Sequence, residues 1–231
     1  MGKNEIEHLK NIQLFSSLTD DELHQIKDKL SLKRYKKHEV ILFEEDTTEY
    51  MYIILNGKTK VTQTTEDGKE ILLAMHHSGE FFGEMSLLDG KTSPATVVAM
   101  EDSSVAIISR QEFYSLIRAQ KRILDNLLLI LCSRLRDSWE KIQLLNLKNA
   151  SQRIKILFLM LSDKYGEKTA EGVTLNIKLT HQEIAEMTGM TRETVTRMID
   201  KWQKDGEIIV LKNRFIHLSS HFITEGIKPI C

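Results

Sequence analysis

The segment from Leu179 to Ser219 constrains the fold of this chain more than any other. Thr180 is followed three residues later by Glu183, a capping-box pattern that begins a helix. Gly189 stands where a tight turn needs a positive φ angle, and Ala185 is small enough for two helices to cross closely. This spacing predicts two short helices joined by a tight turn, which is the helix-turn-helix arrangement.

The second helix of this motif is expected to have one apolar and one polar face. Thr191 can cap it, and Asp205-Gly206 ends it. The apolar face carries Val195, Met198, Ile199 and Trp202. Two short apolar segments follow, at 208–211 and 215–218, and predict a β-hairpin wing after the second helix.

The polar face of the second helix carries residue types that read DNA. Arginine suits the O6 and N7 acceptors of guanine, and glutamate accepts a hydrogen bond from N4 of cytosine. The predicted base-reading residues are Arg192, Glu193, Thr196 and Arg197. The predicted phosphate contacts are Thr180, Thr191, Lys201, Lys204, Lys212 and Arg214. The alternative is a solvated helix with ion pairs four residues apart, such as Glu193 with Arg197.

Net charge adds little to this prediction. The chain has a formal charge of −1. Residues 148–218 carry 12 Lys and Arg against 9 Asp and Glu, whereas residues 1–147 carry 19 against 23. Because phosphate binding needs cations that face one way, the prediction depends on their placement rather than on their number.

The first half of the chain has short strands at regular spacing. Strands are expected at 40–43, 51–55, 70–75, 80–83, 95–100 and 105–108. The turn signals Asn56-Gly57, Asp67-Gly68 and Asp89-Gly90 favour tight hairpins. A capping box at Thr19 predicts a short helix ahead of them. This pattern is typical of an antiparallel β-barrel or jelly roll.

Two helices are expected after the strands. Ser109 caps the first, and the second runs over residues 122–147. Its apolar positions recur at steps of three and four, close to a 3.5-residue seam, and comprise Leu124, Leu128, Leu131, Leu135, Trp139, Ile142 and Leu145. We predict a dimer through Leu124, Leu128, Leu131, Leu135 and Ile142; the alternative is a helix packed on its own barrel. Asn149-Ala150-Ser151 is the expected hinge to a second domain.

These expectations describe an α+β chain in three parts. They are an effector-sensing β-barrel domain over 1–121, a dimerisation helix and hinge over 122–148, and a winged helix-turn-helix DNA-binding domain over 149–231. The apolar run at 123–135 is interrupted by polar residues, and residues 1–10 have no apolar signal core, so we expect a cytoplasmic protein with no membrane partner. The two cysteines, Cys132 and Cys231, suggest no disulfide framework.

Three blocks of the sequence resemble the CRP/FNR family of bacterial transcription regulators, named for the cyclic-AMP receptor protein and the fumarate–nitrate regulator. Phe82-Gly83-Glu84-Met85-Ser86-Leu87-Leu88, with Ala95-Thr96-Val97 downstream, is similar to the phosphate-binding cassette of cyclic-nucleotide-binding barrels. The long helix is the second block. Thr191-Arg192-Glu193-Thr194-Val195-Thr196-Arg197 is similar to the recognition helix of the cyclic-AMP receptor branch.

This resemblance covers nearly the whole chain and implies several properties. They include a homodimer, a small-molecule effector in the barrel, and binding to double-stranded DNA at a palindrome with TGTGA-like half-sites. It implies Arg192, Glu193 and Arg197 as the base readers. It also implies contact with RNA polymerase, which family activators touch in the region corresponding to the polar loop expected at 163–172.

The effector pocket departs from the pattern of cyclic-nucleotide binders. Their cassette reads Arg-x-Ala-Thr, in which the Arg clamps the phosphate, and Ser93 stands at that position here. Glu84, which would bond the ribose hydroxyl, is kept. A cyclic phosphate without the guanidinium loses a charge-assisted bidentate bond, so we expect weak or no binding of cyclic AMP. Another nucleotide, another small ligand and no ligand stay open.

The family's adenine-contacting Thr–Ser pair corresponds to Ser138-Trp139, where Trp139 either stacks on a base or fills the pocket. The predicted pocket residues are Gly83, Glu84, Met85, Ser86, Thr92, Ser93, Ala95, Ser138 and Trp139.

Other sensing chemistries find little support. An iron–sulfur cluster needs several N-terminal cysteines, and none precedes Cys132, to which we assign a packing role. His76 and His77 are adjacent on a strand, face opposite ways and cannot chelate together, so we expect a surface or hydrogen-bonded role and no metal site.

The sequence contains no nucleophile elbow, phosphate-binding loop or metal-ligand cluster, so no enzyme is expected. The alternative function is a cyclic-nucleotide-binding signalling module without DNA output, against which the helix-turn-helix and wing argue. The identity of the effector and the choice between activation and repression stay open.

Overall fold

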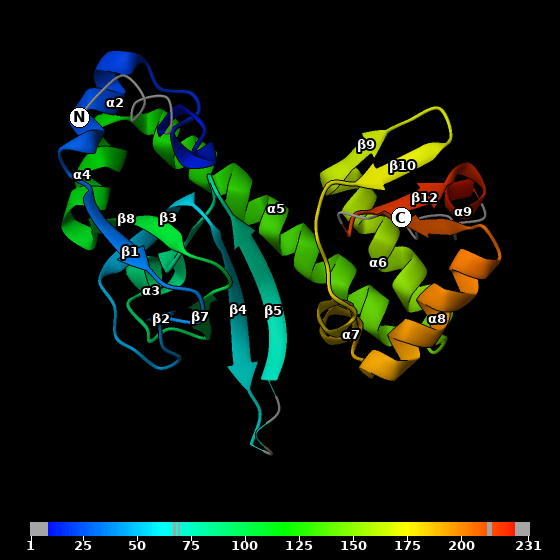
Figure 1. Cartoon of the computed structure of the whole chain (residues 1–231). Coiled ribbons are helices and arrows are strands. Elements are labelled where there is room, and N and C mark those ends of the chain that lie inside the picture. Colours follow the sequence, from blue (N-terminus) through cyan, green and yellow to red (C-terminus); the bar gives the residue numbers. More distant parts are fainter. Residues whose placement is uncertain (1–8, 67, 69, 212–213, 225–231) are drawn as a thin grey trace. The chain divides into compact units, whose positions relative to one another are not determined.

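The computed structural model describes residues 9–66, 68, 70–211 and 214–224. The chain forms two compact units, Met1–Leu135 and Arg136–Cys231 (Figure 1). The boundary falls within the long helix α5 (Lys121–Asn146), so this helix contributes to both units. The three-part division at 1–121, 122–148 and 149–231 stays a prediction. In the described residues no helix is long and apolar enough to cross a membrane.

The first unit contains two four-stranded antiparallel sheets in a jelly-roll-like arrangement, as predicted. One has the strand order β1 (Ser31–Tyr35), β8 (Ser103–Ser109), β3 (Tyr50–Asn56) and β6 (Phe81–Phe82). The other has the order β2 (Val40–Leu42), β7 (Thr96–Ala99), β4 (Lys58–Thr64) and β5 (Glu70–His77). Inward side chains from both sheets, among them Tyr52, Phe82 and Val97, form one buried cluster between them.

Helices cover the other face of the β3-containing sheet. The 3-10 helix η1 (Gln13–Phe15), α2 (Asp20–Lys27), α4 (Arg110–Ala119) and the start of α5 share a second buried cluster with this sheet. Phe15, Met51, Phe113 and Ile123 belong to it. The predicted capping box at Thr19 and the predicted cap at Ser109 are both confirmed. Local side-chain acceptors therefore begin two of the helices that bury this cluster.

Two of the three predicted hairpin turns are wrong. Of the elements flanking these three signals, only β4 and β5, on either side of Asp67-Gly68, pair as a hairpin. Gly57 instead carries the chain from one sheet to the other, and a Cβ there would lie 2.2 Å from the Ser103 hydroxyl oxygen. Gly90 ends α3 (Glu84–Asp89), a helix that the sequence reasoning missed. A positive φ is required at both glycines, but it does not determine which strands pair.

The second unit is a helical domain with a small sheet. Its elements are α6 (Ala150–Tyr165), β9 (Gly166–Lys168), β10 (Gly172–Leu175), α7 (His181–Thr188), α8 (Arg192–Lys204), β11 (Ile208–Val210), β12 (Ile216–Ser219) and α9 (Ser220–Thr224). The strand order is β11-β12-β10-β9. Phe158, Trp202 and Phe222 meet in its core, with ring centroids 5.2 to 6.3 Å apart.

Two sequence expectations in this unit need correction. The region 163–172 is not a plain loop, because it holds the end of α6, the strand β9 and the turn into β10, which pairs with β9. The expected hinge is largely helical, since Asn149 caps α6 by accepting hydrogen bonds from the amides of Ser151 and Gln152. Ala150 and Ser151 therefore lie in the first turn of α6.

Candidate nucleic-acid interface and effector pocket

The pair α7 and α8 has the predicted helix-turn-helix geometry. Thr180 caps α7 in a complete capping box with Glu183. Gly189 ends α7 in the left-handed conformation, at φ 64° and ψ 38°, where an L side chain would be strained. Thr191 then caps α8, accepting a hydrogen bond of 3.3 Å from the amide of Thr194. The cap, turn and cap predicted from the sequence are therefore confirmed.

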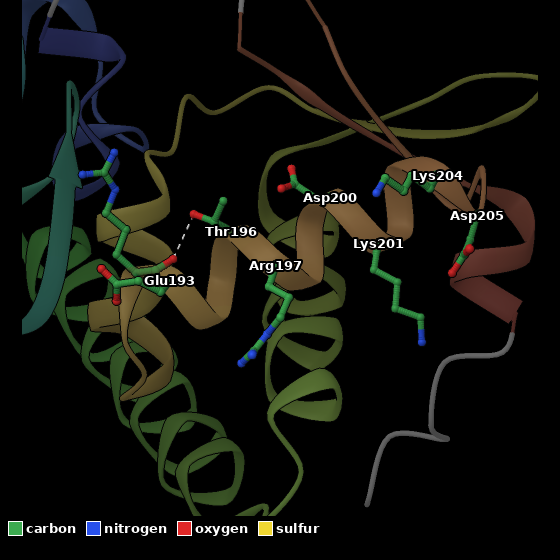
Figure 2. A pocket seen from close by; sticks show the side chains of 8 residues that line it. Glu193, Thr196, Arg197, Asp200, Lys201, Lys204 and Asp205 are labelled. Carbon is green, nitrogen blue, oxygen red and sulfur yellow. Dashed lines mark hydrogen bonds between the residues drawn. The ribbon is translucent and has the colours of Figure 1, made fainter.

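Helix α8 buries one face and exposes the other. Val195, Ile199 and Trp202 are buried in the core of the second unit. The opposite face lines a surface groove of about 690 Å³ (Figure 2), whose lining residues are Arg192, Glu193, Thr196, Arg197, Asp200, Lys201, Lys204 and Asp205. All four predicted base readers and two of the predicted phosphate contacts thus share one surface.

The groove also contains features that the sequence reasoning missed. Asp200 and Asp205 lie among the cations, and both follow the helical spacing of the polar face. The hydroxyl of Thr196 donates to the carbonyl of Arg192 at 3.0 Å and lies 2.8 Å from His181 Nδ1, so it is already engaged. Among the described residues, Glu193 and Arg197 form no ion pair with each other, and the choice between base reading and a solvated polar face stays a prediction.

The wing and the helix caps hold the remaining predicted phosphate contacts. Strands β11 and β12 pair as an antiparallel hairpin, as predicted, and Arg214 lies exposed between them with a φ of 66°. Thr180 and Thr191 are exposed at the starts of α7 and α8, and their hydroxyls are used as caps. Lys212 lies outside the described residues. Contact of these residues with phosphate stays a prediction.

The cassette of the first unit begins at a glycine in the left-handed conformation. Gly83 has a φ of 81° and precedes α3, and a Cβ there would lie 2.9 Å from the carbonyl oxygen of Tyr50. Glu84 and Ser86 are buried, whereas Met85 is exposed. The chain therefore buries Glu84 at the first turn of a short helix, and its bond to a ribose hydroxyl stays a prediction.

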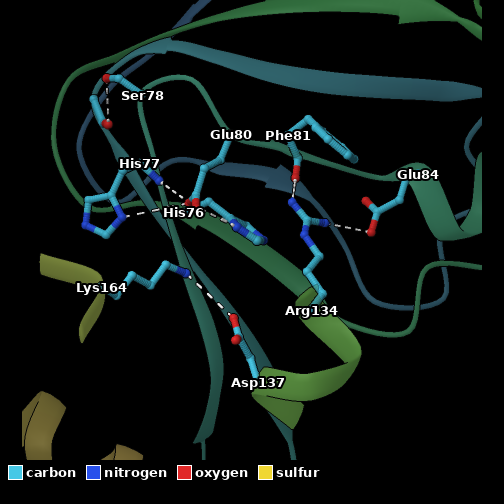
Figure 3. A network of polar contacts seen from close by, with 10 residues as sticks. His76, His77, Ser78, Glu80, Phe81, Glu84, Arg134, Asp137 and Lys164 are labelled. Carbon is cyan, nitrogen blue, oxygen red and sulfur yellow. Dashed lines mark hydrogen bonds and ion pairs between the residues drawn. The ribbon is translucent and has the colours of Figure 1, made fainter. Parts of the chain in front are cut away.

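The residue that meets Glu84 is Arg134 of α5, which the sequence reasoning did not assign to the pocket. Its Nη1 donates to Glu84 Oε1 at 2.8 Å and its Nη2 to the Phe81 carbonyl at 2.5 Å (Figure 3). The guanidinium also lies over the Phe81 ring, 4.5 Å from its centroid. The available signal was a cation inside the largely apolar run at 123–135.

Ser93 is buried inside its own loop. Its hydroxyl donates to the carbonyl of Ala95 at 2.9 Å. Its backbone amide and carbonyl bond to Asp46 and Glu45, each at 2.8 Å. Thr92 beside it is exposed, and Ala95 is buried. The Ser93 side chain therefore stabilises the cassette loop rather than presenting a free donor.

The remaining predicted pocket residues, Ser138 and Trp139, are exposed and belong to the part of α5 in the second unit. Their participation in the pocket stays a prediction.

His76 and His77 share one carboxylate (Figure 3). Their Nδ1 atoms lie 3.5 and 3.9 Å from Glu80 Oε2, and the His77 amide donates to the same oxygen at 2.9 Å. Both rings reach the same carboxylate because β5 ends at His77 and the chain turns back at once through Glu80. Of this pair, the His77 amide is hydrogen-bonded to Glu80, and the His76 ring lies beside the same carboxylate.

Burial opposes ionisation of Glu80, but the nearby His76 ring and the hydrogen bond from the His77 amide outweigh it and hold the pKa of Glu80 well below its usual range. Within the described residues, no cluster of three His, Cys, Asp or Glu side chains is suited to hold a metal ion.

Helix α5 has two apolar faces. Ile123 and Leu127 are buried in the core of the first unit, as the alternative interpretation of this helix requires. Leu128, Leu135 and Ile142, spaced by seven residues, are each more than half exposed. Leu124 and Leu131 are half-buried, and Cys132 is exposed in the single chain. The second face therefore has no cover within the described chain.

Comparisons with known proteins agree with this geometry. The family model for the cyclic nucleotide-binding domain matches residues 32–120, and that for the Crp-like helix-turn-helix domain matches residues 152–220. The cyclic AMP receptor protein of Thermus thermophilus is 29% identical over 87% of this chain and 89% of its own. The cAMP-activated global transcriptional regulator CRP of Escherichia coli is 30% identical over 83% of this chain and 90% of its own.

A solved structure shows the same fold. The CooA mutant structure from Carboxydothermus hydrogenoformans superposes with a TM-score of 0.78 at 22% identity, covering 88% of this chain and 90% of that one. At this identity the likeness concerns the fold alone.

Proposed function

The chain belongs to the CRP/FNR family of DNA-binding transcription regulators, and from this premise we propose that it acts as a homodimer that reads palindromic DNA. The observation that carries the proposal is the exposed face of α8, where Arg192, Glu193 and Arg197 line one groove. Its relatives are transcription regulators rather than enzymes, and the match over 152–220 leaves no support for a signalling module without DNA output.

The first two turns of α8 are the part that enters the major groove in this motif. Arg192, Glu193 and Thr196 lie there, and Arg197 follows on the same face. We assign base reading to these four residues. Lys201, Lys204 and Arg214 lie farther along α8 and in the wing, where they position the domain on phosphates together with the caps Thr180 and Thr191. TGTGA-like half-sites are the proposed target.

The dimer is proposed to form through the exposed face of α5. A heptad of Leu128, Leu135 and Ile142 gives the spacing of a two-stranded coiled coil. Burying three large apolar side chains that are otherwise half exposed contributes on the order of several kcal/mol per chain. A two-fold dimer also presents two copies of α8, as a palindrome requires.

The first unit is proposed to sense a small molecule beside Glu84. The cyclic nucleotide-binding domain match supports an effector of this general kind, and Arg134 supplies a guanidinium next to the cassette. Cyclic AMP is expected to bind weakly, since Ser93 is buried where the phosphate-clamping arginine would stand. We also propose that the region 163–172 contacts RNA polymerase. The protein is proposed to act in the cytoplasm, where chromosomal DNA lies.

Selection from random double-stranded DNA tests this function. Wild type, with and without candidate nucleotides, should enrich a palindrome whose half-sites are centred roughly 10–11 base pairs apart. A variant with both Arg192→Ala and Arg197→Ala should lose that enrichment. Arg118→Ala, which removes an exposed arginine from the first unit, is the matched control and should keep it. Failure of wild type to enrich any palindrome would overturn the proposal.

A further inference from the structure

Arg153 of α6 lies between the C-terminal ends of two other helices. Its Nε donates to the carbonyl oxygen of Leu147 at 2.6 Å, and its Nη1 donates to that of Thr188 at 3.2 Å. Leu147 directly follows the last residue of α5, and Thr188 is the last residue of α7. One side chain therefore bridges the end of the proposed dimer helix and the turn that leads to α8.

The chemistry of these three groups is complementary. The last carbonyls of a helix have no partner within the helix and carry the negative end of its dipole. Arg153 is half-buried, and its planar guanidinium can direct two N–H groups to two acceptors at once. A lysine keeps the charge but has a single ammonium at the end of a flexible chain, so it cannot reproduce this fork.

Leu145 of α5 lies close to the same junction. A Cβ at Gly189 would lie 3.4 Å from Leu145 Cδ2 and 3.8 Å from Arg153 Nη1. Gly189 follows Thr188 in the left-handed conformation, and two residues later Thr191 caps α8. The end of α5 thus touches the turn from which the base-reading helix starts.

We propose that Arg153 is a positioning residue that fastens the end of α5 to the α7–α8 turn and so fixes the direction in which α8 leaves that turn. The readout in DNA binding rests on the function proposed above. Arg153 itself is not assigned to a base or a phosphate. A purely stabilising cap would lower the melting temperature, whereas a positioning residue also changes how well a folded domain discriminates its site from other DNA.

The variants Arg153→Gln and Arg153→Lys test this in the full-length chain. Lys148→Gln is the matched control, because it removes one positive charge from the exposed residue next to Leu147. Binding is measured on the selected palindrome and on scrambled DNA over a salt series, at a temperature where circular dichroism shows each variant folded. We expect Arg153→Gln to weaken specific binding roughly 5- to 30-fold, in the range of a coupling residue. Arg153→Lys should fall between it and wild type.

Nonspecific binding and the salt slope should stay as in wild type, since no phosphate contact is lost. A reduced salt slope would overturn the proposal by showing that Arg153 contacts DNA directly. A lower melting temperature with unchanged discrimination would overturn it in favour of a stabilising cap. Full wild-type discrimination in Arg153→Lys would overturn the proposal that the guanidinium must bond both carbonyls at once.

Hydrogen exchange on the free protein gives a readout that needs no DNA. In Arg153→Gln, the amides of residues 185–191 should exchange faster, while those of 156–164 in α6 should not change. An equal change of the exchange rates in both regions, relative to wild type, would overturn the fastening role. If wild type selects no DNA sequence, the proposed function fails, yet this measurement still decides whether Arg153 fastens the turn.

Discussion

The guanidinium of Arg134 donates a 2.8 Å hydrogen bond to the carboxylate of Glu84 and ties helix α5 to the first residue of α3. Glu84 is 6% exposed, so in the free protein its carboxylate depends on this partner. Any effector that bonds to Glu84 must therefore join or displace Arg134. This relationship places a positive charge from the long helix at the cassette whose own arginine is absent.

Removing Arg134 should destabilise the first unit. Arg134→Gln leaves the Glu84 carboxylate buried without its charged partner, which we expect to lower the free energy of unfolding by about 1–3 kcal/mol, less than for a fully buried pair because Arg134 is a quarter exposed. Urea unfolding measures this. Arg136→Gln removes an exposed arginine two residues farther on and should have little effect. Equal losses in the two variants would contradict the role of the pair.

Cyclic AMP binding should be weak in wild type and stronger in Ser93→Arg. The substitution restores a guanidinium at the position where cyclic-nucleotide binders clamp the phosphate, at the cost of the hydrogen bond from Ser93 to Ala95. Calorimetry with cyclic AMP, cyclic GMP and cyclic dinucleotides measures the change. Thr92→Arg adds the same charge at the exposed neighbour and should not strengthen the binding of cyclic AMP. Submicromolar binding of cyclic AMP by wild type would show that the interpretation of Ser93 is wrong.

Charge on the exposed face of α5 should prevent dimerisation. Leu128→Glu and Leu135→Glu each force a carboxylate into the proposed apolar interface and should give monomers in sedimentation. Ser133→Glu adds the same charge to an exposed residue outside the heptad of Leu128, Leu135 and Ile142, and should remain dimeric. An unchanged dimer mass in both leucine variants would remove α5 from the interface.

The helix starts were predictable because their signals are local. The capping residues Thr19, Ser109, Thr180 and Thr191 bond to amides three residues away, so the sequence pattern contains both partners. The same locality explains why Gly189 was placed correctly: a short turn between two capped helices needs one left-handed residue.

The errors arose where distant segments meet. Gly57 was expected in a hairpin, yet it lies where the chain passes from one sheet to the other. A side chain at this position would collide with Ser103, 46 residues away in the sequence. Arg134 lies 50 residues from Glu84, and Arg153 lies 35 from Thr188. Periodicity describes each of these residues on its own element only, so neither pairing was visible in the sequence.

The low pKa of Glu80 should make stability depend on pH. Because the folded-state pKa is below the unfolded value of about 4.3, Glu80 stabilises the fold above that value, and the stabilisation is lost as pH falls toward the folded pKa. Urea unfolding of wild type and Glu80→Gln should therefore give a difference that grows between about pH 3 and pH 5.5.

His76→Phe serves as the matched variant for this pH dependence. This substitution preserves an aromatic ring against Phe82 but removes one partner of Glu80. When His76→Phe is present, the stability difference caused by Glu80→Gln should grow less with pH. A constant difference between wild type and Glu80→Gln over this pH range would contradict the prediction.

The residues of the α8 groove should divide into two classes by their effect on DNA binding. Arg192→Ala should relax preference at particular base pairs, with about 1–3 kcal/mol of discrimination lost, because an arginine in the first turn reaches base edges. Lys204→Ala lies in the last turn and should weaken all sequences similarly, reducing the salt slope by about 1.

Binding of each variant to the selected palindrome and to single-base substitutions, over a salt series, separates these effects. Lys201→Ala should behave like Lys204→Ala, and Arg197→Ala like Arg192→Ala, because each pair has the same proposed class of contact.

The acidic residues Asp200 and Asp205 give an internal check. Asp200→Asn removes a negative charge from the same groove and should strengthen binding to all sequences, since it reduces repulsion of the phosphates. If Arg192→Ala leaves the preferred sequence unchanged while Lys204→Ala alters it, the assignment of base readers and phosphate contacts along α8 is reversed.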